Sequence, residues 1–420
     1  MTAQKGRFLP YLGLTFLIGF GFFTMGLMDS LYDTYIPLFL KRFLPDSSFA
    51  VGGLMAMDNL LQLILIPILA IWSDRTRTRI GRRMPFIIVM LPVSAALFCL
   101  VPTVAAWSLL AFVGLLFVFN IFKTSIRGPV VALMPDQIPG DFRSEANGVI
   151  NMMGGIGLIV GTIALGRLFK TSESLPFLVA GLCIVAAVLV LAIGVREKLP
   201  DADAAAAEDN PSLIFSLKQV FRGSNASVIR ILFALFLWFV AYEGIKPFLS
   251  LYMVEVLKVG KGMEALGMGV AGVSSVILAV PSGYLAHKFG RRRLIRFSLV
   301  FIAAILALVP LPALLAGRLG FSPSLVLSLF FATMFLYGAF WIGVVVNSFP
   351  MLWQMATFGT MGVYTGVYYT FSQGAAIIGP PLTGAINDYA GYPGIFFFGA
   401  ACMIGAFFLM RGVSAGEAAH

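Results

Sequence analysis

The segment "WSDRTRTRIGRRMPF", residues 72–86, places five arginines and one aspartate between two long apolar runs. A second segment, "YLAHKFGRRRLIRF" at residues 284–297, repeats the Gly-Arg-Arg core of the first. Gly81 and Gly290 occupy the same place in the two segments, almost half a chain apart. This spacing predicts two similar halves, each with a basic loop after its second apolar run.

The composition on either side of these loops is that of a polytopic membrane protein. The chain is 59% hydrophobic and 11% charged, with a mean hydropathy of +0.94, whereas soluble domains average about 25% charged residues. The net charge of +10 falls in short loops between apolar runs, so we attribute it to membrane orientation and expect no nucleic-acid partner. The opening "MTAQKGRFLP" lacks a small-residue cleavage site, so no cleavable signal peptide is expected.

The apolar runs predict an all-α membrane protein with twelve transmembrane helices in two six-helix pseudo-repeats, because a helix needs about 20 apolar residues to cross a bilayer. The first six spans are expected near residues 11–40, 49–72, 84–105, 107–135, 143–169 and 175–195. The other six are expected near residues 227–257, 264–287, 296–317, 322–350, 360–386 and 392–411. The first span of each half is longer than a perpendicular crossing requires, so it should tilt or protrude.

The domain organisation follows from the same pattern. Residues 1–195 form the predicted N-terminal bundle, and residues 227–420 form the C-terminal bundle. Residues 196–226 form a linker that ends in an amphipathic helix with an apolar face of Leu213, Leu217, Val220 and Phe221. Most of the 29 lysines and arginines fall on one side of this topology, which predicts a cytoplasmic (inner) membrane protein with both termini in the cytoplasm.

The two basic loops are candidates for a cytoplasmic latch between helices. Asp74 can accept hydrogen bonds from a neighbouring helix start or from an arginine. The alternative is that the arginines only set the topology. The candidate latch residues are Asp74, Arg75, Gly81, Arg82, Arg83, Gly290, Arg291 and Arg292.

Three segments carry a family resemblance. "SDRTRTRIGRRMPFI" closely resembles a loop of the sucrose/proton symporters, "RGPVVALMPDQIPGDFRSEANGVINMMGGIG" is similar to their fourth-span exit, and "AMDNLLQLILIPILAIWSDR" is similar to their second span. The resemblance is strong over roughly residues 20–165. These symporters belong with the glycoside–pentoside–hexuronide:cation carriers of the major facilitator superfamily, so the resemblance implies a bacterial relative that takes up a sugar together with a cation.

One position departs from the resembled pattern. Plant sucrose carriers place an aspartate in the fourth span, where this chain has Asn120. Because asparagine does not titrate, the proton site is absent or lies elsewhere.

Charged residues inside the spans are the main candidates for coupling. Each costs roughly 2.5–3.5 kcal/mol at the centre of a membrane helix, so these groups must be paired or hydrated. Helical spacing predicts Asp29 or Asp33 paired with Arg127 or Lys123, and Glu243 paired with Lys246. The proton candidates are, in order, Asp33, Asp29 and Glu243. The alternative is that the pairs are structural; Asp58, the seventh such residue, can also hold Asn59 or Gln62.

Substrate candidates combine amide or charged groups with aromatic rings, because sugars present hydroxyl groups and flat C–H faces. Such rings also occur in packing and interface belts. The candidates are Asn120, Lys123, Arg127, Asn147, Asn151, Tyr242, Lys246, Tyr337, Trp341 and Asn347.

The expected function is secondary active transport, with proton-coupled uptake of a disaccharide or other glucoside by alternating access as the first hypothesis. Sodium is the alternative coupling ion. The competing functions are a drug or other small-molecule antiporter and a non-transporting membrane receptor. No nucleophile–base pair, Walker sequence or metal-ligand cluster is evident, so we expect neither an enzyme nor a cofactor, and we expect a monomer in the lipid bilayer. Cys99, Cys183 and Cys402 are expected to pack as small hydrophobes.

Overall fold

The computed structural model describes residues 8–139, 142–197, 226–355 and 361–414, and these residues form helices and connecting loops without a strand. Helices dominate because a bilayer offers no hydrogen bonds to the backbone, so each spanning segment must satisfy its own. The all-α prediction is confirmed for this part of the chain. The predicted linker and its amphipathic helix lie outside the described residues.

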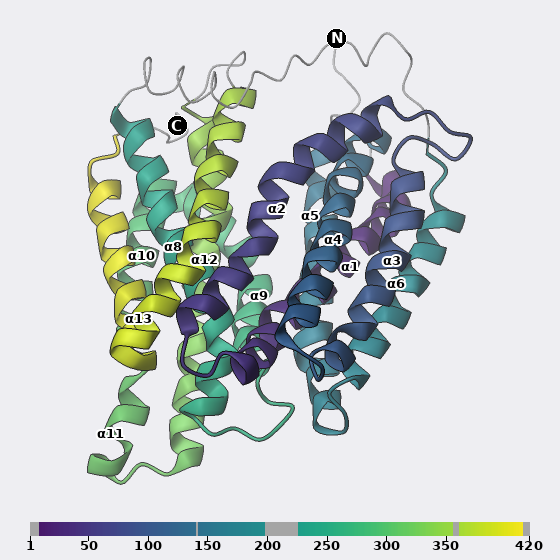
Figure 1. The fold of residues 1–420 in the computed structure, drawn as a ribbon. Helices are drawn as coiled ribbons and strands as arrows, with labels where there is room; N and C mark the ends of the chain where they lie inside the picture. Colours follow the sequence, from purple (N-terminus) through teal and green to yellow (C-terminus); the bar gives the residue numbers. More distant parts are fainter. Residues whose placement is uncertain (1–7, 140–141, 198–225, 356–360, 415–420) are drawn as a thin grey trace. The chain divides into compact units, whose positions relative to one another are not determined.

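The N-terminal half matches its predicted spans closely (Figure 1). Its helices are α1 (Leu9–Phe43), α2 (Ser48–Arg75), α3 (Met84–Val104), α4 (Leu109–Gln137), α5 (Arg143–Ile159) and α6 (Leu175–Gly194). α5 continues through a π-helical segment, Val160–Leu165, and a 3₁₀ segment, Gly166–Lys170. With 35 residues, α1 is longer than a perpendicular crossing requires, as its apolar run predicted.

The C-terminal half differs from prediction at two places. Its helices are α8 (Ala226–Glu255), α9 (Leu266–Phe289), α10 (Arg291–Leu308), α11 (Leu311–Leu319), α12 (Pro323–Trp353) and α13 (Met361–Arg411). The predicted span 296–317 is bent by 40° between α10 and α11, beside Pro310, because proline cannot continue the hydrogen-bond ladder. α13 contains both final predicted spans, which meet at the non-helical Gly391.

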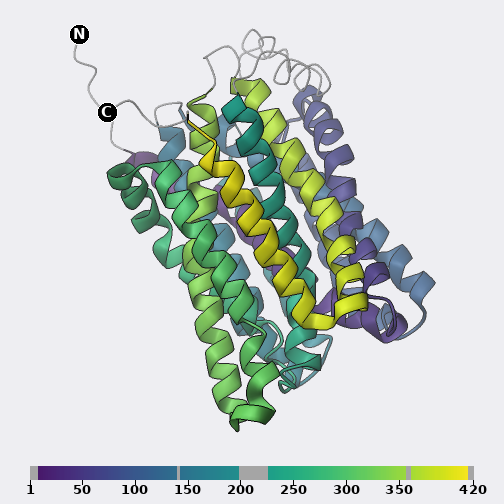
Figure 2. The ribbon, with the colours of Figure 1, turned by 90° about the vertical axis from the view of Figure 1, so that its left-hand side faces the viewer.

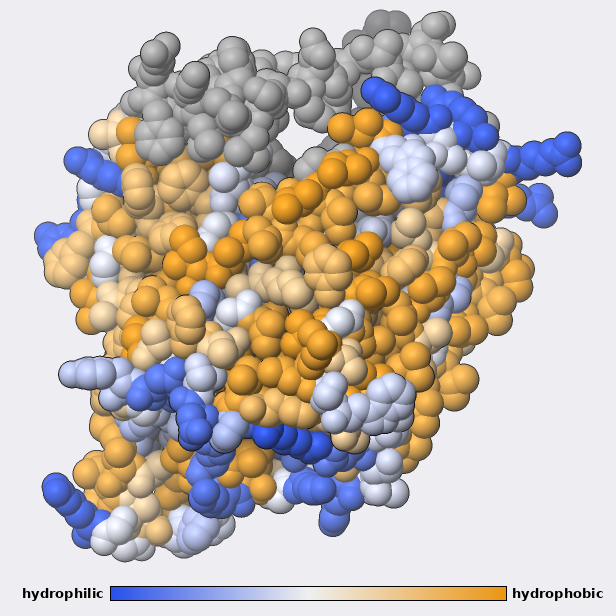
Figure 3. Space-filling model, in the orientation of Figure 1, coloured by the Kyte–Doolittle hydropathy of each residue, from blue (hydrophilic) through white to orange (hydrophobic). Residues whose placement is uncertain are grey.

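The helix lengths fit a polytopic protein. Ten described helices are long and apolar enough to cross a membrane, or eleven when α10 and α11 count as one. Division of α13 at Gly391 gives the predicted twelve. In Figure 3 the surface over the helices is largely apolar, and hydrophilic side chains gather at the α2–α3 loop, at the upper right.

Contacts divide the chain into two compact units. The first comprises Met1–Tyr32, Leu61–Ala207 and Lys261–Ala265, and the second comprises Asp33–Leu60, Glu208–Gly260 and Leu266–His420. In this division the end of α1 and the start of α2 are grouped with the helices of the C-terminal half.

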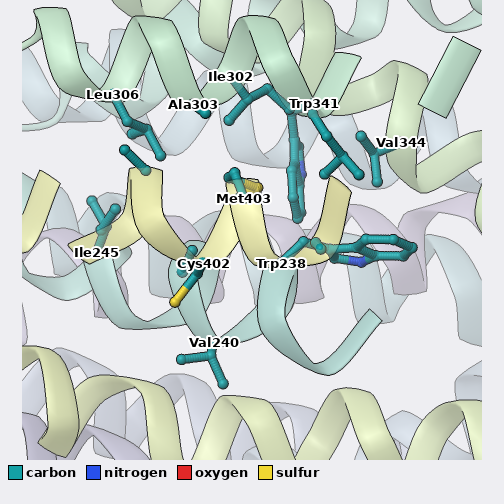
Figure 4. Packing of buried hydrophobic residues seen from close by; sticks show 14 of the residues in the cluster. Trp238, Val240, Ile245, Ile302, Ala303, Leu306, Trp341, Val344, Cys402 and Met403 are labelled. Atoms are coloured by element: carbon teal, nitrogen blue, oxygen red, sulfur yellow. The ribbon is translucent and has the colours of Figure 1, made fainter. Parts of the chain in front are cut away.

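Large apolar side chains form the core of the second unit. α8 and α13 pack along each other, as the two ribbon views show (Figures 1 and 2). In Figure 4, Trp238 of α8 and Met403 of α13 face Ile302 of α10 and Trp341 of α12. Trp238 and Met403 are fully buried, so this core fixes the helices that carry the candidate residues of α8 and α12.

The start of α2 packs against α13 within the second unit. The carboxylate of Asp388 accepts the backbone N–H groups of Ser48 at 2.6 Å and Phe49 at 2.8 Å. Asn387 donates to the Ser48 hydroxyl at 2.8 Å. A side chain at Gly52 would collide with the carbonyl of Pro380, so the two backbones lie in close contact. An acidic residue of α13 thus caps the N-terminus of α2.

Candidate functional site

In the first unit, α1 and α4 bring three charged side chains together. The Lys123 Nζ lies 2.7 Å from Asp29 Oδ1, and Arg127 Nη1 lies 3.8 Å from Asp29 Oδ2. Lys123 and Arg127 are one turn apart on α4, so a single carboxylate reaches both. The predicted pairing of Asp29 with the bases of the fourth span is confirmed, and the close partner is Lys123.

Tyr32 connects this ion pair to Asn120. The Lys123 ammonium lies 4.5 Å from the centre of the Tyr32 ring, and the Tyr32 hydroxyl accepts a hydrogen bond of 2.9 Å from Asn120 Nδ2. The Tyr32 ring stacks on Phe119, and Phe119 stacks on Phe98. The rings of Phe119 and Phe98 hold Tyr32 against Lys123, and Asn120 is fully buried.

A pocket of about 230 Å³ opens beside the Asp29–Lys123 pair. Thr124 lines it and is 2% exposed, and its hydroxyl has no hydrogen-bond partner among the described residues. Arg127 also lines the pocket, with 43% of its side chain exposed. Polar groups in this position are available to a bound solute. The lining residues are Met25, Asp29, Gln62, Lys123, Thr124 and Arg127.

In the second unit, one lysine forms ion pairs with two carboxylates. The Lys246 Nζ lies 2.9 Å from Asp33 Oδ2 and 3.2 Å from Glu243 Oε2. The predicted Glu243–Lys246 pair is confirmed. The contact between Asp33 of α1 and Lys246 of α8 was not among the predicted pairs.

An aromatic stack lies beside this lysine. The rings of Tyr242 and Trp341 are parallel within 6° with centroids 4.3 Å apart, and Tyr337 lies parallel to Trp341 at 6.3 Å. Tyr242 and Tyr337 also line a mostly apolar pocket of about 340 Å³ together with Lys246. One turn of α12 separates Tyr337 from Trp341, so the two rings lie on the same face of that helix.

The three remaining asparagine candidates lie apart from these pockets. Asn347 is buried, and its amide donates to the Ser282 hydroxyl and to the Gly343 carbonyl, which is a packing role. Asn147 and Asn151 are exposed on α5, where the Asn151 amide donates to Asn147 Oδ1 at 3.0 Å. No contact of the described residues links these two to Asn120 or Arg127.

The first basic loop forms a buried charge network within the first unit. Arg82 donates to both carboxylate oxygens of Asp136, at 2.6 and 3.1 Å. Arg83 donates to Asp136 at 3.0 Å and also contacts Asp74. Glu197, whose side chain is fully buried, accepts the backbone N–H groups of Arg83 and Met84 at the start of α3. The predicted contact of Asp74 with an arginine is confirmed.

Sequence reasoning missed two members of this network, Asp136 and Glu197. Each lies just beyond a predicted span, close to the same membrane face as the basic loop. The available signal was an acidic residue just after the end of an apolar run. Exposed acidic residues in loops are common at the same place, so this pattern does not identify a buried acid.

The second basic loop contacts the end of the described part of the chain. Arg292 donates to the carbonyl of Ser414 at 2.8 Å, and Gly290 precedes α10 with φ of 89°. Gly81 likewise has φ of 115° and precedes α3 by three residues. Arg75 is exposed at the end of α2, and Arg291 lies at the start of α10. Both loops therefore contain a glycine with positive φ, whereas their arginines contact different groups.

Gly81→Ala should lower the free energy of unfolding by at least about 1–2 kcal/mol, because a positive φ strains any residue with a Cβ. The added Cβ would also collide with the Glu197 carboxylate. Thermal unfolding of the purified protein measures the effect. Gly148→Ala is the matched control, because Gly148 lies on α5 with open space around it. Equal midpoints for Gly81→Ala and Gly148→Ala would contradict this account of the loop.

Comparison with known families decides the identity of the fold. A sequence profile of the Major Facilitator Superfamily matches residues 18–377. The chain belongs to this superfamily. Members of the superfamily are generally transporters, and the confirmed helical architecture agrees with this membership.

Solved transporters share the fold of this facilitator at low sequence identity. A variant of the nucleoside transporter NupG is 12% identical, with a TM-score of 0.72 over 95% of this chain and 99% of that chain. A bacterial homologue of the human lysosomal transporter Spinster is 13% identical, with a TM-score of 0.71 over 97% and 96%. A D-xylose–proton symporter is 14% identical, with a TM-score of 0.70 over 96% and 98%. A search of curated protein sequences found no match.

Proposed function

We propose that this facilitator takes up a sugar or glycoside together with a proton by alternating access, as a monomer in the cytoplasmic membrane with both termini in the cytoplasm. The observation that carries the proposal is the contact of Lys246 with Asp33 and Glu243 beside the parallel rings of Tyr242 and Trp341. The expected coupling ion is the proton, and no cofactor is required.

The charge of this cluster supports proton coupling. Asp33 and Glu243 share one ammonium group, so the three side chains carry one negative charge in excess when both acids are ionised. One proton on either carboxylate neutralises the cluster, which lowers the cost of a charge held within a membrane span. Protonation also weakens the hold of that carboxylate on Lys246, so an N–H of the lysine becomes available to a solute.

The aromatic rings beside the lysine support a sugar substrate. The parallel stack of Tyr242 and Trp341 is set next to a cationic donor, a combination that suits the apolar face and the hydroxyl groups of a sugar ring. Lys246 lies 5.9 Å from the centre of the Tyr242 ring. The same lysine therefore contacts the proposed proton-binding carboxylates and lies beside the proposed sugar-binding rings. Protonation of a carboxylate then directly affects the binding of the solute.

External pH in lightly buffered, de-energised cells that express the protein tests both parts of this proposal. Sucrose, maltose, melibiose and several glucosides are added in turn. Alkalinisation with one sugar, abolished by a protonophore, is the expected result. Cells that express Lys246→Met provide the control, because this variant should give a flat trace with the same sugar.

Other outcomes separate the competing functions. Labelled uptake that needs sodium and leaves pH unchanged would reassign the coupling ion. Absence of uptake and of pH change with all sugars would overturn the proposed function and favour an antiporter of other small molecules. Binding of sugar without uptake in sealed vesicles would favour a receptor.

A further inference from the structure

We infer that the solute carries a carboxylate group, which binds Arg127 and Thr124 in the pocket of the first unit, and that it moves with one proton without net charge. The inference rests on the proposed proton-coupled transport and narrows its substrate class to acidic solutes, such as sugar acids. It comes from the charges that line the pocket of the first unit, from the charges of Asp33, Glu243 and Lys246 in the second unit, and from two side chains with unused hydrogen-bonding capacity.

The first observation is the charge of the α1–α4 pocket. Lys123 and Arg127 line it with two positive charges, and Asp29 lines it with one negative charge. Asp29 lies closest to Lys123, at 2.7 Å, and its nearest approach to Arg127 is 3.8 Å. The second distance exceeds that of a hydrogen bond. The residues that line the pocket therefore carry one positive charge in excess.

The second observation is the state of the polar groups around that charge. The guanidinium of Arg127 makes no hydrogen bond to another described residue, although it offers five N–H donors in a planar fork. The hydroxyl of Thr124 is buried in the same pocket and has no partner within the described residues. A buried hydroxyl group without a partner is costly, so a ligand that accepts its hydrogen bond is favoured.

The guanidinium group of Arg127 and the hydroxyl group of Thr124 together indicate which chemical group the ligand carries. A guanidinium fork matches the two oxygens of a carboxylate, and Thr124 precedes Arg127 by one turn of α4, so both donors face the same space. A single excess positive charge balances a monoanion. A phosphate dianion would need a second cation, and Asp29 already neutralises the nearest one, Lys123.

The opposite excess in the second unit completes the charge balance. Asp33, Glu243 and Lys246 together carry one negative charge, which one proton neutralises. A carboxylate at Arg127 and a proton at Asp33 or Glu243 therefore bring no net charge into the protein. Since both ligands cross together, transport should follow the pH gradient and should respond little to membrane voltage.

The full chain in proteoliposomes tests the inference with D-glucuronate and D-galacturonate, each against its neutral amide and its parent sugar. Uptake of at least one acid is expected to follow an imposed pH gradient, and an imposed potassium diffusion potential alone should drive no uptake. The neutral analogues should enter at least about tenfold less well, because they lack the charge that Arg127 binds. The corresponding 6-phosphate, a dianion, should compete weakly.

Substitutions at two positions, Arg127 and Thr124, locate the effect. Arg127→Gln should weaken binding of the acid by about tenfold to a hundredfold, and Arg127→Lys should recover part of that loss through its charge. Thr124→Val, which keeps the shape of the side chain, should weaken binding several-fold. The matched control is Arg167→Gln, because Arg167 is exposed in the 3₁₀ segment after α5 and should bind the acid unchanged. Shifts in thermal stability of the purified protein report binding independently of transport.

The outcomes distinguish this inference from the proposed function. Proton-coupled uptake of neutral sugars with equal or better affinity, or uptake accompanied by an electrical current, would overturn the inference and leave the proposed function standing. Equal discrimination between acid and amide in wild type and Arg127→Gln would also overturn it. Absence of proton-coupled flux with every acid and every neutral sugar would overturn both.

Discussion

Asp33→Asn is expected to abolish accumulation of solute against its gradient while exchange of labelled for unlabelled solute continues. Asparagine has the shape of a protonated aspartate but releases no proton, so the variant should bind solute without coupling it. Lys246 keeps Glu243 as a partner at 3.2 Å, which should preserve folding. One pH unit stores about 1.4 kcal/mol per proton, so the variant should lose about tenfold accumulation for each unit of gradient.

The measurement compares accumulation and counterflow in the same proteoliposomes at an imposed pH gradient. Asp46→Asn is the control, because Asp46 is exposed in the loop after α1. Preserved accumulation by Asp33→Asn would move the proton site to Glu243, and the equivalent Glu243→Gln variant would then be expected to lose coupling. Loss of counterflow as well as accumulation would instead give Asp33 a role in solute binding.

Glu197→Ala is expected to cost about 3 kcal/mol of stability. The substitution removes the acceptor of two backbone N–H groups at the start of α3, those of Arg83 and Met84. Loss of a helix cap costs about 0.5–2 kcal/mol, and each buried donor left without a partner costs about 1–3 kcal/mol. At an unfolding entropy of about 2.1 cal/mol/K per residue, a chain of 420 residues should unfold at least about 3 °C lower.

Thermal unfolding of the purified protein in detergent checks this value. Glu145→Ala removes an exposed glutamate of α5 and should leave the midpoint unchanged. Glu197→Gln keeps one acceptor oxygen and should fall between wild type and Glu197→Ala. A midpoint for Glu197→Ala equal to that of Glu145→Ala would show that water replaces the carboxylate at the start of α3.

Most of the fold was predictable because a segment that crosses the membrane must be a helix that forms all its own backbone hydrogen bonds. Such a helix appears in the sequence as a long apolar run. The breaks within spans were harder to predict, since proline acts differently in different places. Pro37 and Pro247 lie inside long helices, whereas Pro310 stands at the bend between α10 and α11. Local sequence does not reveal whether neighbouring helices compensate the lost hydrogen bond.

The charged residues of the two ion-pair clusters were predictable from the sequence, but their pairing was predictable only in part. Periodicity placed Lys123 and Arg127 on one face of a helix, and Tyr337 and Trp341 on another. It also gave Asp29 and Asp33 a common face but did not indicate that Asp33 pairs with Lys246 of α8, as Asp29 pairs with Lys123 of α4. The two carboxylates are only one turn of α1 apart. Which base each of them contacts depends on the angle at which the helices cross, and helical periodicity does not specify that angle.

The capped start of α2 has a kinetic consequence. Any movement that parts α2 from α13 takes the Asp388 carboxylate away from the N–H groups of Ser48 and Phe49. Because Asp388 is exposed, water can take its place, and the loss amounts to about 1–2 kcal/mol. That is roughly a tenfold bias toward the joined arrangement. Under the proposed proton-coupled cycle, such a bias would slow cycling of the empty carrier, so that less of the proton gradient would be lost between solute molecules.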